Sequence, residues 1–238
     1  MIPRIIPQIY FDFGRGSYRT IPDFCWQHDK TEVFCKNNKI DLKFWNEKQI
    51  EELIEIDYPE FWKTYQDFPH KIQKVDFAKY ILLHKFGGIY LDMDVKPMAS
   101  IEDLFKRTYF FVRWNNDKDN KPYNAVMGTS IGLPLFYEIL LHSCESFEEK
   151  KDMPIYQKWF GRFVYQTTGH HMINRVLKKN KISIDNILDI MFIHNPTKNI
   201  CVFPGTGNES IFSDCNTSAW YSKNAVGEEC PPQDPTSH

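Results

Sequence analysis

The pattern of apolar and polar positions predicts strands and helices that alternate along most of the chain. The clearest helix is 71–86, because its apolar residues recur on one stripe and Gly87-Gly88 ends it. Asn46 and Gln49 have the spacing of a capping box at the start of another helix. Further helices are predicted at 22–36, 50–56, 60–68, 133–147, 155–166 and 170–179, and strands at 4–14, 39–45, 89–95, 109–114, 124–130, 191–194 and 199–205.

This alternation predicts the α/β class, with a mixed and mostly parallel sheet. No repeat and no linker interrupts residues 1–205. We therefore expect one domain over residues 1–222. The last residues, 223–238, are polar and rich in proline, which predicts a flexible C-terminal tail.

Composition excludes several classes of protein. Apolar residues make up 42% of the chain and aromatic residues 16%, which is enough for a core and excludes general disorder. The formal net charge of −2 does not favour a nucleic-acid partner. No apolar run is long enough for a membrane span, and the six cysteines form no C-x-x-C pair. We expect a cytoplasmic protein with reduced cysteines and no structural zinc.

Asp92 and Asp94 form a D-x-D motif at the end of a predicted strand. A D-x-D is weak evidence alone, because this chain contains a second one, Asp117 and Asp119, in a polar stretch without periodicity. In a strand, Tyr90 would project to the same side as both carboxylates of the first motif. Charged groups at that place need a crevice, a partner or a cation. Their hard oxygen atoms suit Mg²⁺ or Mn²⁺ bound to a diphosphate.

Other polar residues give weaker signals. Asp76 and Lys79 share one face of the helix 71–86, which alone indicates an ordinary surface ion pair. Gly88 fits a helix end, a close approach of the backbone to a ligand, or both. The pair His170-His171 lacks a third metal ligand at a suitable spacing. The chain contains no G-x-S-x-G, H-E-x-x-H or G-K-[ST] motif, which removes the commonest hydrolase, zinc-protease and P-loop hypotheses.

The segment VDFAKYILLHKFGGIYLDMDV, residues 75–95, resembles the DXD sugar-binding region of glycosyltransferase family 32. That family includes yeast-type α-1,6-mannosyltransferases and capsular polysaccharide sugar transferases. The segment is similar, more distantly, to the glucosyltransferase domain of large clostridial toxins. One departure is Lys79, which stands where the family has Arg and lacks the planar fork of a guanidinium.

Weaker similarities flank this segment. The opening strand resembles that of the family, with Tyr10 where an aromatic residue lies beside the nucleotide base. The segment TTGHHMIN resembles a T-G-P type turn, and Ser218-Ala219-Trp220 is similar to an S-x-W in the toxins. The His-rich metal loop of the mannosyltransferases is missing near Trp220, so Ser218 and Asn216 are the candidates for a third metal ligand.

The resemblance implies a GT-A fold and retaining transfer of a hexose from a UDP- or GDP-sugar to a hydroxyl of a glycan or glycoconjugate. It implies Mn²⁺ or Mg²⁺ as cofactor, bound by Asp92, Asp94 and Ser218, with the two aspartates as catalytic residues. The donor would contact a wider set, namely Tyr10, Asp76, Lys79, Gly88, Tyr90, Asp92 and Trp220.

Two alternatives from other classes stay open. One is a non-catalytic nucleotide-sugar or carbohydrate-binding module on a decayed GT-A fold, and the other is a metal-dependent phosphohydrolase. The intact D-x-D region disfavours the first, and the small number of carboxylate and histidine ligands disfavours the second. A bacterial cytoplasm or a large virus is the expected setting.

Overall fold

The computed structural model describes residues 1–97, 100–114, 122–182, 187–193, 200–202 and 212–214. Its strands are β1 (Ile5–Tyr10), β2 (Asp41–Asn46), β3 (Gly88–Leu91), β4 (Val95–Pro97), β5 (Tyr109–Trp114), β6 (Pro122–Thr129), β7 (Ile187–Ile193), β8 (Ile200–Val202) and β9 (Phe212–Asp214). Its helices are α1 (Pro22–Asn37), α2 (Glu47–Asp57), α3 (Pro59–Asp67), α4 (Lys71–Phe86), α5 (Glu102–Phe105), α6 (Pro134–Lys150), α7 (Pro154–Lys158), α8 (Phe160–Thr167) and α9 (His170–Lys179).

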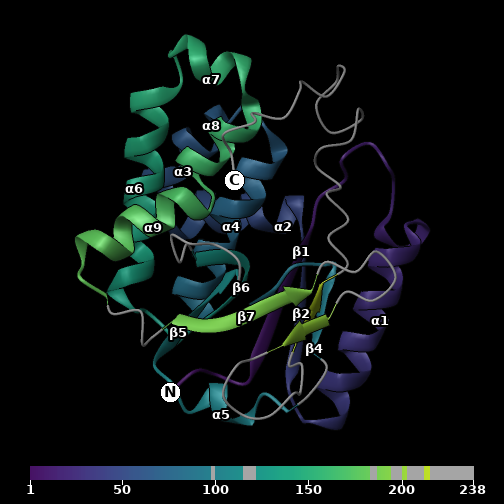
Figure 1. The fold of residues 1–238 in the computed structure, drawn as a ribbon. Helices are drawn as coiled ribbons and strands as arrows, with labels where there is room; N and C mark the ends of the chain where they lie inside the picture. The colour runs from purple at the N-terminus through teal and green to yellow at the C-terminus, as the bar shows by residue number, and fades with distance from the viewer. Residues whose placement is uncertain (98–99, 115–121, 183–186, 194–199, 203–211, 215–238) are drawn as a thin grey trace.

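The strands lie between two layers of helices (Figure 1). Helices α2, α3, α4, α6, α8 and α9 bury their apolar faces in one large cluster, which Tyr90, Phe111 and Met127 of the sheet join. The opposite face of the sheet presents Ile89 and Phe110, which pack with residues of α1 and α5 in a second cluster. The change of cluster from Ile89 to Tyr90 follows the alternation of side chains along a strand.

The sheets are mixed, as predicted, but antiparallel pairing is commoner than expected among the described strands. Strand order in the largest sheet is β3-β6-β5-β7-β8. Pairs β1–β2 and β5–β7 are parallel, whereas β3–β6, β5–β6, β7–β8 and β4–β9 are antiparallel. The expectation of a mostly parallel sheet was wrong because β5 and β6 follow each other too closely for a crossover connection, so they pair as antiparallel neighbours.

Most predicted elements are confirmed, and a few boundaries differ. Helix α4 and strand β5 have the predicted bounds, and Asn46 and Gln49 form both hydrogen bonds of the capping box. The helix predicted at 155–166 is divided into α7 and α8 at Trp159. The short helix α5 and strand β9 were not predicted, because three or four residues carry no readable periodicity.

A close approach between β1 and β3 explains the Gly87-Gly88 pair. Both residues have positive φ, +65° and +102°. A Cβ on Gly88 would lie 2.5 Å from the carbonyl oxygen of Ile5, and one on Gly87 would meet the ring of Pro3 at 2.8 Å. A side chain at either position would therefore force β1 away from β3.

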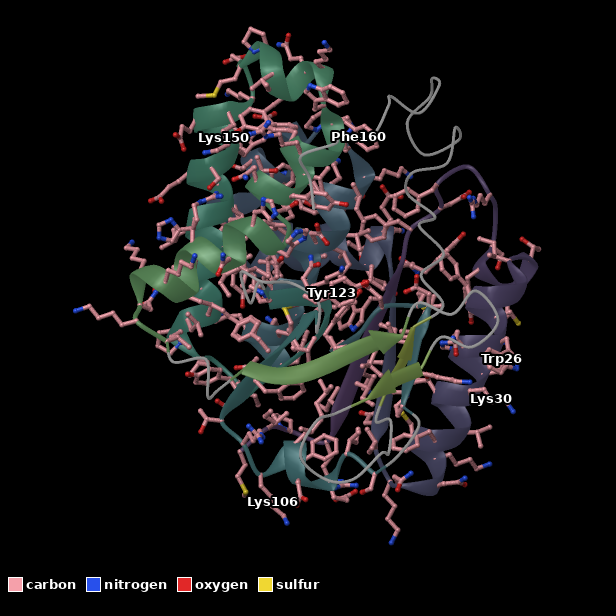
Figure 2. All side chains as sticks on the ribbon, in the orientation of Figure 1. Trp26, Lys30, Lys106, Tyr123, Lys150 and Phe160 are labelled. Atoms are coloured by element: carbon pink, nitrogen blue, oxygen red, sulfur yellow. The ribbon has the colours of Figure 1, made fainter. Side chains whose placement is uncertain are left out.

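Helix α1 covers the side of the molecule away from α4. Trp26, about half exposed on α1, contacts strand β4, because the Lys96 ammonium lies 3.5 Å from the centre of its ring. Figure 2 shows Trp26 and Lys30 on the outer side of this helix. Within the part of the chain that the structure describes, no helix is long and apolar enough to cross a membrane.

Candidate functional site

The D-x-D motif lies in a turn that follows β3. The backbone N–H of Asp92 still donates to Ala125 of β6, and Val95 then donates to the carbonyl of Asp92, which closes the turn. The expectation of one strand over 89–95 was therefore wrong, since β3 ends at Leu91. The side chains of Asp92 and Asp94 are both partly buried. They thus stand at the carboxyl end of a buried strand, where open α/β sheets bind ligands.

Lys79 and Tyr90 hold the carboxylate of Asp92. The Lys79 ammonium lies 2.9 Å from Asp92 Oδ1 and 3.3 Å from Oδ2, and the Tyr90 hydroxyl donates to Oδ1 at 2.9 Å. Tyr90 is fully buried, whereas the Asp92 side chain is 28% exposed. The predicted common orientation of Tyr90 and Asp92 is confirmed by this contact. Oδ2, which has only the longer bond to Lys79, is the Asp92 oxygen best able to accept a ligand.

Asp76 lies on the other side of Lys79. Its Oδ1 accepts from the Lys79 ammonium at 3.0 Å, and the side chains of Asp76 and Lys79 are only 5% and 3% exposed. The expectation of a surface ion pair was therefore wrong, because α4 is enclosed on nearly all sides over this stretch. Asp76, Lys79 and Asp92 form one chain of charges with a net charge of −1 when all three are ionised.

Burial shifts the pKa values of this group. Desolvation raises the pKa of Asp76 to about 6, and the adjacent Lys79 ammonium opposes that shift. For Lys79, desolvation acts to lower the pKa, but the two carboxylates together outweigh it, and its pKa is raised. The pKa of Tyr90 is also raised, by burial first and then by Asp92, so it remains a hydrogen-bond donor at neutral pH.

Two residues that the sequence analysis missed complete the surroundings of Asp76. Asn124 on β6 donates to Asp76 Oδ1 at 3.0 Å, and the hydroxyl of Thr168, between α8 and α9, lies 3.4 Å from Oδ2. Each is a single polar residue far from α4 in the sequence, so no spacing pattern connects either residue to Asp76. The double threonine of the TTG turn, whose members are both fully buried, was the available signal for Thr168.

Tyr10 borders a hollow at the carboxyl ends of the parallel strands β1 and β2. Tyr10 pairs with Asn46, and both line this hollow of about 390 Å³. The phenol of Tyr10 donates to the carbonyl of Gly16 at 2.6 Å, which holds its ring beside the hollow. The other lining residues are Asp12, Gly16, Ser17, Glu47 and Lys48. A volume of this order is typical of small-molecule sites.

Packing and one buried glutamine connect this hollow to the D-x-D turn. Met93, between the two aspartates, packs in a cluster with Tyr10 and Phe24. Gln8, two positions before Tyr10 on β1, is fully buried and approaches the carbonyl of Asp92 at 3.5 Å. The strand that borders the hollow is therefore joined to the D-x-D turn through buried contacts.

The remaining predicted site residues are placed as follows. Gly88 is buried against β1, where close packing excludes a side chain, and its contact with the donor stays a prediction. Asn216, Ser218 and Trp220 lie outside the described residues, as does the tail 223–238. Among the described residues, no group of three or more His, Cys, Asp or Glu could hold a metal ion. Asp92 and Asp94 nevertheless supply the oxygen donors that a hard divalent cation prefers.

Comparison with known proteins gives a consistent result. Residues 19–111 match the family described as "Glycosyltransferase sugar-binding region containing DXD motif". Inositol phosphoceramide mannosyltransferase 3 of Schizosaccharomyces pombe is 31% identical over 96 residues, which cover 40% of this chain and 26% of that protein. Uncharacterized glycosyltransferase L373 of Acanthamoeba polyphaga mimivirus is 30% identical over 138 residues, which cover 57% of this chain and 53% of that protein.

The chain spans about half the length of these relatives or less. Among solved structures, the PaToxG glycosyltransferase aligns with 75% of this chain and 70% of its own, at a TM-score of 0.48 and 13% identity. The resemblance stated from the sequence is confirmed by the family match. The α/β class is confirmed by the structure, and GT-A is the fold that this family resemblance implies.

Proposed function

We propose that the chain is a metal-dependent, retaining hexosyltransferase, because residues 19–111 match the family of glycosyltransferase sugar-binding regions that contain a DXD motif. The proposed donor is a UDP- or GDP-hexose, and the proposed acceptor is a hydroxyl of a glycan or glycoconjugate. The observation that carries this proposal is the D-x-D turn, whose first carboxylate is held by Lys79 and Tyr90.

The nucleotide would lie in the hollow at the ends of β1 and β2. Tyr10 offers a half-buried aromatic ring there, and the ring is fixed by its bond to Gly16. An aromatic face suits a nucleobase because every base has a π surface. Trp220, in the segment that resembles the toxins' S-x-W, would contact the nucleotide from another side.

Asp92 and Asp94 would bind the metal, with Ser218 as the proposed third protein ligand. A divalent cation bound there would offset the negative charge that develops on the departing diphosphate. Asp92 would meet the ligand through Oδ2, since Lys79 and Tyr90 already occupy Oδ1. Lys79 orients this carboxylate, because its ammonium contacts both oxygens.

The hexose would lie against this turn, on the side of Asp76. A sugar hydroxyl can donate a hydrogen bond to a buried carboxylate. A hydrogen bond to an ionised group is stronger than one between two neutral groups. Asp76 and Lys79 would thus contribute to binding of the hexose, while the buried Tyr90 acts on the donor through Asp92. The acceptor hydroxyl would replace the diphosphate at the anomeric carbon with retention of configuration.

A screen of nucleotide sugars tests this proposal. The protein is incubated with UDP-glucose, UDP-galactose, UDP-N-acetylglucosamine or GDP-mannose in the presence of Mn²⁺, and released nucleoside diphosphate is measured. We expect turnover with at least one donor, and proton NMR of the released hexose, recorded before its anomers equilibrate, should show the anomeric configuration of the donor. Saturable binding without turnover would instead support a non-catalytic binding module.

A further inference from the structure

Asp76 is surrounded by hydrogen-bond donors from three separate elements. Lys79 of the same helix and Asn124 of β6 both donate to Oδ1, each at 3.0 Å. The Thr168 hydroxyl, at the junction of α8 and α9, lies 3.4 Å from Oδ2 and also 3.4 Å from the carbonyl oxygen of Val164, so it can donate its one proton to either acceptor. Each carboxylate oxygen can accept two hydrogen bonds, so Oδ1 is fully used and Oδ2 retains one acceptor site.

Tyr80 fixes the position of Thr168. The Tyr80 hydroxyl donates to the carbonyl of Thr168 at 2.5 Å. Asp76 and Tyr80, one helical turn apart on α4, therefore both bond Thr168. These three residues are at most 4% exposed, so the two bonds are largely shielded from competition with water.

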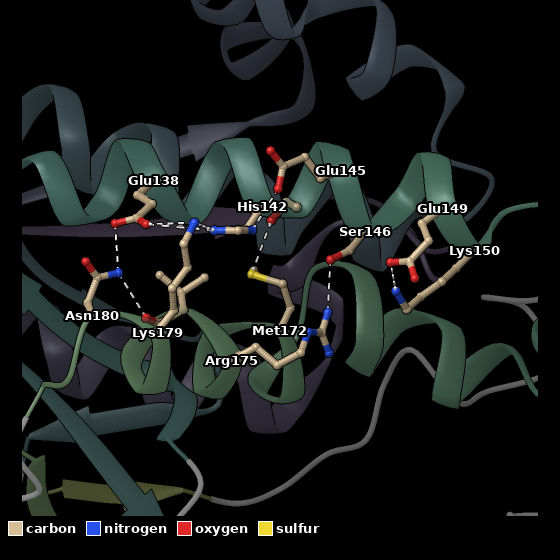
Figure 3. Close-up of polar contacts among 12 residues, drawn as sticks. Glu138, His142, Glu145, Ser146, Glu149, Lys150, Met172, Arg175, Lys179 and Asn180 are labelled. Carbon is tan, nitrogen blue, oxygen red and sulfur yellow. Dashed lines mark hydrogen bonds and ion pairs between the residues drawn. The ribbon is translucent and has the colours of Figure 1, made fainter.

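The α8–α9 junction is itself anchored on both sides. Close packing limits its backbone, because a Cβ on Gly169 would lie 2.9 Å from the Cα of Tyr165. Helix α9 is held against α6 by polar contacts along its length, which Figure 3 shows. Arg175 donates to the hydroxyl of Ser146 at 2.9 Å, and Asn180 donates to Glu138 at 2.8 Å. Thr168 is thus presented to Asp76 by a rigid part of the helical layer.

We propose that Thr168 is a positioning residue that orients the Asp76 carboxylate, so that the remaining acceptor site of Oδ2 is available to a hydroxyl of the donor hexose. This inference rests on the proposed function. Without the Thr168 hydroxyl, Asp76 is fixed only through Oδ1 and its plane can turn about that oxygen. The nucleoside diphosphate part of the donor does not use this contact, so its binding should not depend on Thr168.

Thr167 provides a matched control. It is the adjacent residue and is equally buried, but its hydroxyl accepts from Gln73 at 2.8 Å and donates to the carbonyl of Phe163 at 2.7 Å. Replacing either threonine by valine removes one buried hydroxyl from the same turn with little change of shape. Only the substitution of Thr168 removes a bond to Asp76.

The experiment compares Thr168→Val, Thr168→Ser and Thr167→Val with the wild-type protein, using a nucleotide sugar that the wild type turns over and the matching nucleoside diphosphate. We expect Thr168→Val to lower kcat/KM for the nucleotide sugar about tenfold or more, since hydrogen bonds to charged groups are worth roughly that factor. Its Kd for the nucleoside diphosphate should equal that of the wild type. Thr168→Ser, which restores the hydroxyl, should restore kcat/KM, and Thr167→Val should retain it.

The possible failures are distinguishable. If the wild type turns over a donor and Thr168→Val behaves like Thr167→Val, the inference is wrong and the proposed function stands. An equal loss of donor turnover and of nucleoside diphosphate affinity would also overturn it, because that result indicates general damage. If Thr168→Val does not fold, Thr168→Ser provides the test. A kcat/KM of Thr168→Ser below that of the wild type then overturns the inference. A wild type without turnover of any donor overturns the proposed function and this inference together.

Discussion

Lys79 lies 2.9 Å from Asp92, which joins the middle of the buried helix α4 to the turn that follows β3. The same ammonium lies 3.0 Å from Asp76. A single cation therefore separates two carboxylates that would otherwise repel each other in a largely buried place. Through these contacts Lys79 links helix α4 to the D-x-D turn.

We expect Lys79→Met to destabilise the protein by about 3–5 kcal/mol, because breaking a buried ion pair leaves an uncompensated charge. Chemical denaturation measures the free energy of unfolding. The double variant Lys79→Met/Asp76→Asn should recover part of the loss, since it removes one of the two unpaired carboxylates. Equal stability of Lys79→Met and the wild type would show that the ion pair contributes nothing to the fold.

Asp94→Asn should abolish turnover of the nucleotide sugar, because it removes a charge proposed to bind the metal. Asp117→Asn changes the second D-x-D of the sequence, outside the described residues, and should leave turnover nearly intact. Initial rates of nucleoside diphosphate release provide the comparison. Equal losses in the two variants would contradict the assignment of the metal site to the first motif.

Removal of divalent cations should stop turnover without unfolding the protein. The described core is formed by apolar clusters and hydrogen bonds, and the proposed cation serves the diphosphate. Metal-stripped protein is therefore expected to keep its circular dichroism spectrum and to regain activity with Mn²⁺ or Mg²⁺. Full turnover in excess chelator would refute metal dependence.

Acid should inactivate the enzyme through Asp76. Its pKa is raised to about 6, by burial, from the ordinary value of 3.8, and the ionised form is the one that accepts from a sugar hydroxyl. We expect kcat/KM to fall as the pH decreases through about 6. Because the folded state binds this proton more tightly than the unfolded state, the contribution of Asp76 to stability decreases as the pH rises from 3.8 to about 6.

Carbon-13 NMR of the aspartate carboxyl carbons checks the pKa directly. The resonance of Asp76 is the one that is lost in Asp76→Asn. A midpoint of titration near 6 would agree with the raised pKa. A midpoint below 4, with an unchanged rate between pH 5 and 7, would contradict it.

The sequence was sufficient to predict the helices and strands that have a strong periodicity or clear signals at their ends. Helix α4 could be predicted to the residue because an apolar stripe runs along it and Gly87, at φ +65°, ends it. The capping box of Asn46 and Gln49 was equally readable. The relative direction of paired strands was harder to predict, because side chains alternate in the same way in parallel and antiparallel strands.

The D-x-D turn could be found from local sequence, but its partners could not. A spacing of three residues places Asp76 and Lys79 on one helix face, but it does not show whether that face is exposed. The nearly continuous apolar run around them was the sign that α4 is buried. Asn124 and Thr168 meet Asp76 only through the tertiary arrangement of β6 and the α8–α9 junction.

The proposed hexosyltransferase cleaves the bond between the hexose and the diphosphate of a nucleotide sugar. Slow transfer to water in H₂¹⁸O, followed by mass spectrometry of the nucleotide product, shows which bond is broken. We expect release of a nucleoside diphosphate without ¹⁸O, because water attacks the anomeric carbon, and no release by Asp94→Asn. Nucleoside monophosphate and hexose phosphate, with ¹⁸O in one of the phosphates, would identify a phosphohydrolase and rule out glycosyl transfer.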